Sequence, residues 1–149
     1  MMFFAALALM VQATSVPPQP PASISAADGV ASCPGPFFGF LPNSDRFNPG
    51  TEQGMDAIVD HMNSILWRHG WFTVEATVRD TSDPAARDLV RRRQQTILRA
   101  LVERGVARER IQFSPTQADA GTGLEDTFII MSNVSGRIWQ ELVGPGIVC

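Results

Sequence analysis

The feature that most constrains the fold is an alternating segment followed at once by a capped amphipathic one. Residues 71–79 read WFTVEATVR, with apolar side chains at every second position, which is typical of a strand that buries one face. Asp83 and Pro84 then supply an N-cap acceptor and a proline for the first helical position. An apolar stripe of helical spacing continues to Gly105. This unit predicts a helix packed across one face of a sheet.

The segment before this unit repeats the pattern of strand and amphipathic helix, and two further strands follow the unit. A run of successive apolar positions near the end of the chain predicts a central strand covered on both faces. The order is β-α-β-α-β-β, which predicts an α/β (α+β) two-layer sandwich with two helices on one face of a mixed sheet. Besides the unit above, the expected elements are a strand over residues 37–41, a helix from Asn48 or Thr51 to Gly70, and strands over residues 111–113 and 127–132.

The amino terminus has the pattern of an export signal followed by a linker. Residues 1–13 combine an apolar run with small side chains at a plausible cleavage site, and the run is shorter than the ~20 residues of a membrane-spanning helix. Because no basic residue precedes the run, an uncleaved anchor or a misassigned start stays open. Residues 14–35 are rich in proline, alanine and serine and predict an extended linker. The expected folded domain is therefore residues 36–149.

Two cysteines, Cys33 and Cys149, bracket this domain. They have no C-x-x-C spacing and no histidine cluster beside them, so a structural zinc site is not expected. A disulfide between them fits export to an oxidising compartment. Two free thiols remain an alternative, as does acylation of Cys33, whose preceding residues resemble a lipobox.

Composition and motifs argue against nucleic-acid binding and catalysis. The net charge is −3, which is unfavourable for general nucleic-acid binding. No G-x-S-x-G motif and no phosphate-binding glycine loop is present. His61 is expected on the surface and His69 at a helix carboxyl end. The sequence therefore predicts a protein that is not an enzyme and has no cofactor or metal.

One charged position is chemically unusual. On a helical wheel Arg93 lies in the middle of the apolar stripe, whereas Arg91 and Arg92 point toward solvent. A buried guanidinium needs an anion or acceptors, and Asp80, at the end of the preceding strand, is the nearest candidate. Side by side, the two could hold a ligand that carries both an amine and a carboxylate. A purely structural ion pair is the alternative.

These residues also carry a resemblance to a known family. Residues 77–80 (TVRD), residues 89–94 (LVRRRQ) and residues 101–106 (LVERGV) followed by Ile111 resemble the motifs of the OmpA-like peptidoglycan-binding domain. That family has a strand ending in G-hydrophobic-T-D and then a helix with L-S-x-R-R-A. It includes domains of flagellar-motor stator proteins and of peptidoglycan-associated lipoproteins. The resemblance covers residues 37–131.

The resemblance implies a non-catalytic module of the cell envelope. In the family, the aspartate and the second arginine of the helix motif bind the diaminopimelate of the peptidoglycan stem peptide. Those roles would fall on Asp80 and Arg93, with a periplasmic or outer-membrane-associated location. Peptidoglycan would be the main partner, and an envelope protein could be a second one.

The sequence departs from the family pattern at several positions. The family's glycine and threonine before the aspartate are Thr77 and Arg79 here, and its basic N-R-R-V before the last strand is residues 125–128 (EDTF). An alternative therefore stays open: a degenerate OmpA-like scaffold or protein-interaction domain of the envelope that no longer binds peptidoglycan. Its partner would contact the surface of residues 37–41 or 139–143.

Overall fold

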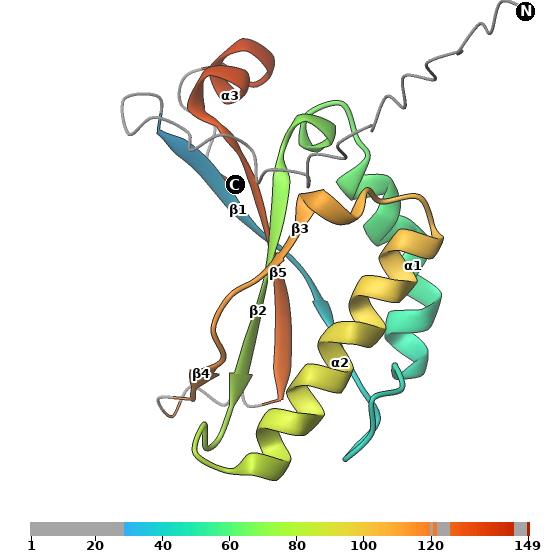
Figure 1. Ribbon diagram of the computed structural model, residues 1–149. Helices are drawn as coiled ribbons and strands as arrows, with labels where there is room; N and C mark the ends of the chain where they lie inside the picture. Colours follow the sequence, from blue (N-terminus) through green and yellow to red (C-terminus); the bar gives the residue numbers. More distant parts are fainter. Residues whose placement is uncertain (1–28, 120, 122–125, 145–148) are drawn as a thin grey trace, which may run out of the picture.

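The computed structural model describes residues 29–119, 121, 126–144 and 149. It shows a twisted mixed sheet with the two long helices, α1 and α2, on one face (Figure 1). Strands follow the order β1-β5-β2-β3, and the short β4 pairs with β2 beyond β3. Strand β5 is antiparallel to both β1 and β2, whereas β3 and β4 run parallel to β2. The predicted α+β class, with two helices on one face of a mixed sheet, is confirmed.

The elements agree with the expected order and add a short strand and a carboxyl-terminal helix. Within the described part of the chain, no helix has the length and apolar character needed to cross a membrane. In chain order the elements are β1 (Val30–Phe38), α1 (Pro49–Met62), a 3₁₀ turn (Trp67–His69), β2 (Trp71–Val78), α2 (Pro84–Glu103), a second 3₁₀ turn (Arg108–Arg110), β3 (Ile111–Phe113), β4 (Gln117–Ala118), β5 (Thr127–Ser135) and α3 (Gly136–Leu142).

Strand β1 begins earlier than the sequence indicated. It starts at Val30 instead of residue 37, so the folded domain includes residues that were assigned to the linker over 14–35. The strand forms because its backbone pairs with β5, from Val30 opposite Ser135 to Phe38 opposite Phe128. Prolines are tolerated there because β1 is an edge strand, where a missing N–H need not break a ladder. Residues 1–28 lie outside the described residues, so the signal peptide over 1–13 stays an expectation.

Helix α1 starts as expected and ends early. The Asn48 side chain accepts a hydrogen bond from the Thr51 N–H at 2.8 Å, and Pro49 takes the first helical position. The helix stops at Met62, and a 3₁₀ turn fills the chain up to Gly70. Gly70 lies so close to the Asn133 carbonyl that a Cβ atom would clash with it. The chain that follows α1 therefore packs its backbone directly against β5 at Gly70.

Helix α2 follows its sequence signals closely. Asp83 caps the helix by accepting a hydrogen bond from the Ala85 N–H, and Pro84 is the first helical residue. At the other end Gly105 has φ +90°, a left-handed conformation that suits glycine, and the Val106 N–H returns to the Leu101 carbonyl. The helix packs its apolar stripe, which includes Ile97 and Leu101, on the sheet.

Strand β5 is central, as predicted, because it pairs with β1 on one side and β2 on the other. The expectation that both of its faces are covered is wrong. Phe128 and Ile130 point into the core under the helices and are fully buried, whereas Ile129 and Met131 on the other face are only half-buried. The run of successive apolar residues predicted that both faces of β5 are covered, but the two long helices pack on the same face of the sheet.

Candidate functional site

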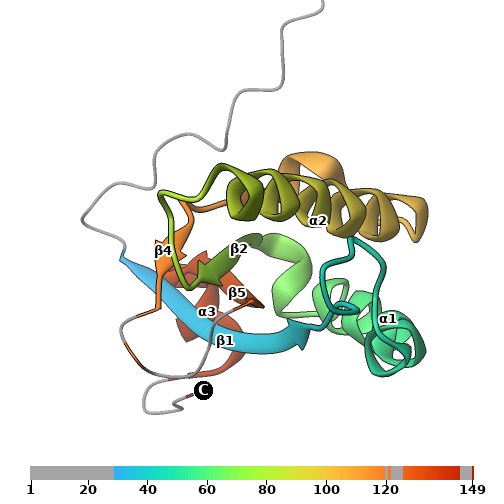
Figure 2. The ribbon, with the colours of Figure 1, turned by 90° about the horizontal axis from the view of Figure 1, so that it is seen from below.

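One end of the sheet gathers the residues singled out in the sequence. Strand β1 ends there and leads into the loop before α1; β2 ends there and leads into α2 (Figure 1). Strand β5 begins at the same end, since Thr127 pairs with Thr77 near the end of β2 and Phe128 pairs with Phe38 at the end of β1. We call this end the rim; Figure 2 looks onto it from below. Ligands are commonly held where strand ends and helix starts meet.

Asp80 is an exposed carboxylate on the rim. Its Oδ1 accepts hydrogen bonds from the Ser82 N–H at 2.8 Å and the Ser82 hydroxyl at 2.6 Å. These bonds lower the pKa of Asp80, the hydroxyl bond contributing most. The turn into α2 therefore holds an ionised carboxylate open to solvent at neutral pH.

Arg93 is buried, with 3% of its side chain exposed. Nε donates to the Ser44 carbonyl at 2.8 Å, and Nη2 lies 3.4 Å from the Leu41 carbonyl. Nη1 lies 3.4 Å from Asp126 Oδ1, and the Phe40 ring is 5.0 Å from the guanidinium carbon. Each edge of the guanidinium therefore has an acceptor, and a ring flanks the group.

Burial and charge act on Arg93 in opposite directions. Desolvation lowers the pKa of Arg93, and the charge of Asp126 raises it again. An arginine keeps its proton under such conditions. The rim therefore holds a fixed, buried positive charge on Arg93. Asp126, the carboxylate beside it, has 71% of its side chain exposed.

Asp80 and Arg93 come to the same rim and do not bond to each other. The expectation of a direct ion pair between them is wrong, because Asp80 bonds to Ser82 and Arg93 bonds to Ser44, Leu41 and Asp126. The helical wheel placed Arg93 correctly but could not show that carbonyls of the loop before α1 accept hydrogen bonds from it. No local sequence signal marks Ser44 or Asp126 as partners.

The other two arginines of the run are outside the core, as the wheel predicted. Arg91 bonds to Asp88 at 2.6 Å and Arg92 lies 3.2 Å from the other oxygen of Asp88, with about half of each side chain exposed or more. Beside them a cavity of ≈ 310 Å³ opens between the first turns of α2 and the loop before α1. It is lined by Asn43, Asp83, Ala85, Ala86, Leu89 and Arg92.

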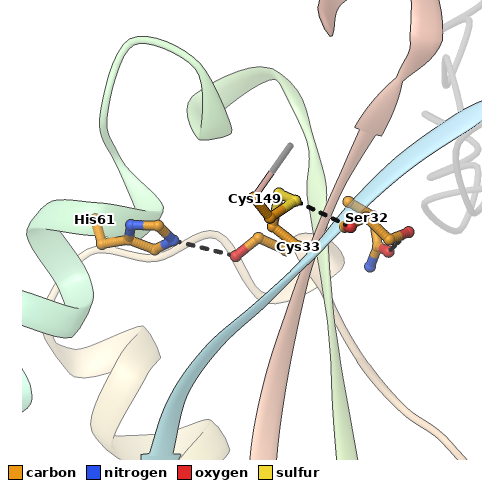
Figure 3. The surroundings of a disulfide bond; sticks show 6 residues. Ser32, Cys33, His61 and Cys149 are labelled. Carbon is orange, nitrogen blue, oxygen red and sulfur yellow. Dashed lines mark hydrogen bonds between the residues drawn. A yellow bond between two sulfur atoms is a disulfide. The ribbon is translucent and has the colours of Figure 1, made fainter. Parts of the chain in front are cut away.

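The opposite part of the sheet carries the predicted disulfide. Cys33 on β1 is bonded to Cys149, with the two Cα atoms 5.4 Å apart (Figure 3). Both cysteines are therefore in the bridge, and not free thiols. Cys33 lies opposite Ser132 in the register of β1 and β5. Ser132 in turn bonds to His61 Nε2 at 3.2 Å, so His61 is half-buried against the sheet instead of lying on the surface.

The His61 contact predicts a pH dependence of stability. Desolvation lowers the pKa of His61 in the folded protein, so on acidification the unfolded chain binds this proton first. The free energy of unfolding is therefore expected to fall as the pH drops from 7 through the unfolded pKa of about 6.5 and on to the lower folded value. Urea titrations at several pH values measure it. His61→Gln should reduce this slope; an equal slope for wild type and His61→Gln would contradict the assignment.

Comparison with known proteins identifies the fold. No family model matches the sequence, and no curated protein matches it. Among solved structures, the OmpA-like domain of FopA1 from Francisella tularensis subsp. tularensis SCHU S4 is similar, with a TM-score of 0.54 and 11% sequence identity. The alignment covers 76% of this chain and 86% of that one. The protein therefore has an OmpA-like fold with a divergent sequence, which confirms the resemblance at the level of fold.

Proposed function

We propose that the protein is a non-catalytic module of the cell envelope that binds the diaminopimelate stem peptide of peptidoglycan at the rim. Its location would be periplasmic or outer-membrane-associated, where an envelope protein could be a second partner. Two features support this proposal: the OmpA-like fold and the exposed, ionised Asp80 at the same rim as the buried Arg93. The Asp80 carboxylate is the single observation that carries it.

The two groups would divide the recognition of the ligand. Both hydrogen bonds of Asp80 use Oδ1, which leaves Oδ2 available for the ammonium group of diaminopimelate. Arg93 would supply the positive charge for a carboxylate, which it can reach through Nη1, since Nε and Nη2 are directed at main-chain carbonyls. Binding of this kind needs charge and position only, with no cofactor and no chemical step.

A second candidate function is an envelope scaffold that has lost the ligand. The favouring observation is that 3% of Arg93 is exposed while its acceptors are Ser44, Leu41 and Asp126. In this candidate Arg93 only fastens the loop before α1 onto α2. A protein partner would then dock on the surface of residues 37–41 or 139–143.

Substitutions on the rim distinguish the two candidates. Asp80→Ala and Arg93→Leu are expected to lower affinity for diaminopimelate-type peptidoglycan at least about tenfold, because each removes a charge-assisted contact. Arg91→Ala and Arg92→Ala should change affinity little, because these side chains point outward and pair with Asp88. Co-sedimentation with purified sacculi measures all four variants.

Folding is the control for these variants. Asp80→Asn keeps the Oδ1 acceptor of the Ser82 turn and removes only the charge, so it should lose binding and melt close to wild type. Arg93→Leu leaves two main-chain carbonyls without a donor and should also lower the melting temperature. Wild-type protein that stays in the supernatant would favour the scaffold. Wild type and Asp80→Asn that pellet equally would contradict the role of Asp80 in binding.

A further inference from the structure

The acceptors of Arg93 are of two kinds. Ser44 and Leu41 offer main-chain carbonyls of one loop, so they fix the guanidinium in place. Asp126 offers a side-chain carboxylate that is 71% exposed, and its Oδ1 lies 3.4 Å from Nη1. This distance, like the 3.4 Å from Nη2 to the Leu41 carbonyl, is long for an N–H···O bond, but of these two acceptors only Asp126 contacts the guanidinium through an exposed side chain. Asp126 is therefore the acceptor that can be replaced without moving the loop.

The backbone of Asp126 also differs from its surroundings. Its φ is +60°, in the left-handed region that non-glycine residues seldom adopt. The next residue, Thr127, is already paired with Thr77 in the sheet. Asp126 thus stands immediately before β5, at the point where the chain enters the rim, and its carboxylate rests on the one guanidinium nitrogen that faces neither carbonyl.

We propose that Asp126 occupies, in the free protein, the position that a ligand carboxylate takes on Arg93, and so sets the charge selectivity of the rim. This inference rests on the proposed function and adds a residue to it. A ligand carboxylate and the Asp126 carboxylate cannot both contact Nη1, because like charges at that distance repel. A carboxylate ligand must displace Asp126, whereas a ligand that brings only an amine to Asp80 meets no competition.

Asp126→Asn is the variant that tests this assignment. Asparagine has nearly the same shape and tolerates positive φ, so the fold is preserved while the competing charge is removed. Affinity for meso-diaminopimelate is expected to rise about three- to tenfold, since an exposed charge pair is weak but its repulsion of the ligand is lost as well. Isothermal titration calorimetry with meso-diaminopimelate and with its diamide gives the affinities.

Two controls make the test specific. Asp60→Asn changes the net charge equally on the exposed side of α1 and should leave both affinities unchanged. The diamide, which keeps both amines and has no carboxylate, should gain little from Asp126→Asn. Equal affinity of wild type and Asp126→Asn for meso-diaminopimelate would overturn the inference, and so would an equal gain from Asp60→Asn. If the Asp126 inference fails in this way and wild type still pellets with sacculi, the proposed function stands without that inference. If neither wild type nor Asp126→Asn binds diaminopimelate or sacculi, the inference and the proposed function are both wrong.

Discussion

Replacing Cys33 and Cys149 together by serine is expected to lower the free energy of unfolding by about 4–5 kcal/mol. The bridge closes a loop with a sequence separation of 116 residues. In the chain-entropy model a loop of this length restricts the unfolded chain by about that amount. The bridge also ties Cys149 to β1, which among the described strands pairs only with β5. Urea denaturation followed by circular dichroism measures the loss.

Reduction of the wild-type protein is the matched control for this prediction. Reduced wild type keeps both sulfur atoms in place, so it should lose nearly as much stability as the double variant. A double variant that is much less stable than reduced wild type would assign the loss to the packing of Cys33, which is buried. A loss below about 1 kcal/mol in both proteins would contradict a stabilising role for the bridge.

Arg110→Met is expected to lower the free energy of unfolding by about 3–5 kcal/mol. The Arg110 guanidinium donates to the carbonyls of Met62 and Trp67 at 2.7 Å and of Gly70 at 3.1 Å. It also stacks over the Phe72 ring at 5.0 Å. One side chain thus satisfies the backbone of the connection between α1 and β2, where the helix ends early. Methionine keeps the apolar stem and removes every donor.

Arg108 provides the comparison for Arg110. It lies two residues earlier in the same 3₁₀ turn and is exposed, so Arg108→Met should change stability by no more than about 0.5 kcal/mol. Thermal melts and urea titrations of the two variants are compared directly. Equal stability of both variants would show that the carbonyls of the connection find other donors, and the account of the early helix end would be wrong.

Local signals in the sequence identified the elements whose formation depends on neighbouring residues. The cap of α2, its glycine end, the alternation of β2 and the central place of β5 all follow from spacing and capping chemistry. Strand β1 was found only in part. Its amino-terminal half contains Cys33 and Pro34, which have no strand pattern of their own, and it is extended because β5 supplies the ladder.

The sequence predicted which residues belong to the candidate site, but not which groups they contact. The position of Arg93 in the apolar stripe correctly indicated a buried charge that needs acceptors. The partners could not be inferred, because Ser44 and Asp126 are 49 and 33 residues away along the chain. Arg110 was missed for the same reason. Its acceptors are the main-chain carbonyls of a distant turn, which carry no sequence signal.

The central claim is that the rim binds a ligand with both an amine and a carboxylate. The most direct test is co-sedimentation of the oxidised wild-type protein with two kinds of purified sacculi, one carrying diaminopimelate in the stem peptide and one carrying lysine. Lysine keeps the side-chain amine and lacks the second carboxylate, so it can use Asp80 and not Arg93. The expected result is saturable pelleting with the diaminopimelate sacculi and at least about tenfold weaker pelleting with the lysine sacculi. Equal pelleting with both, or none with either, would contradict the claim.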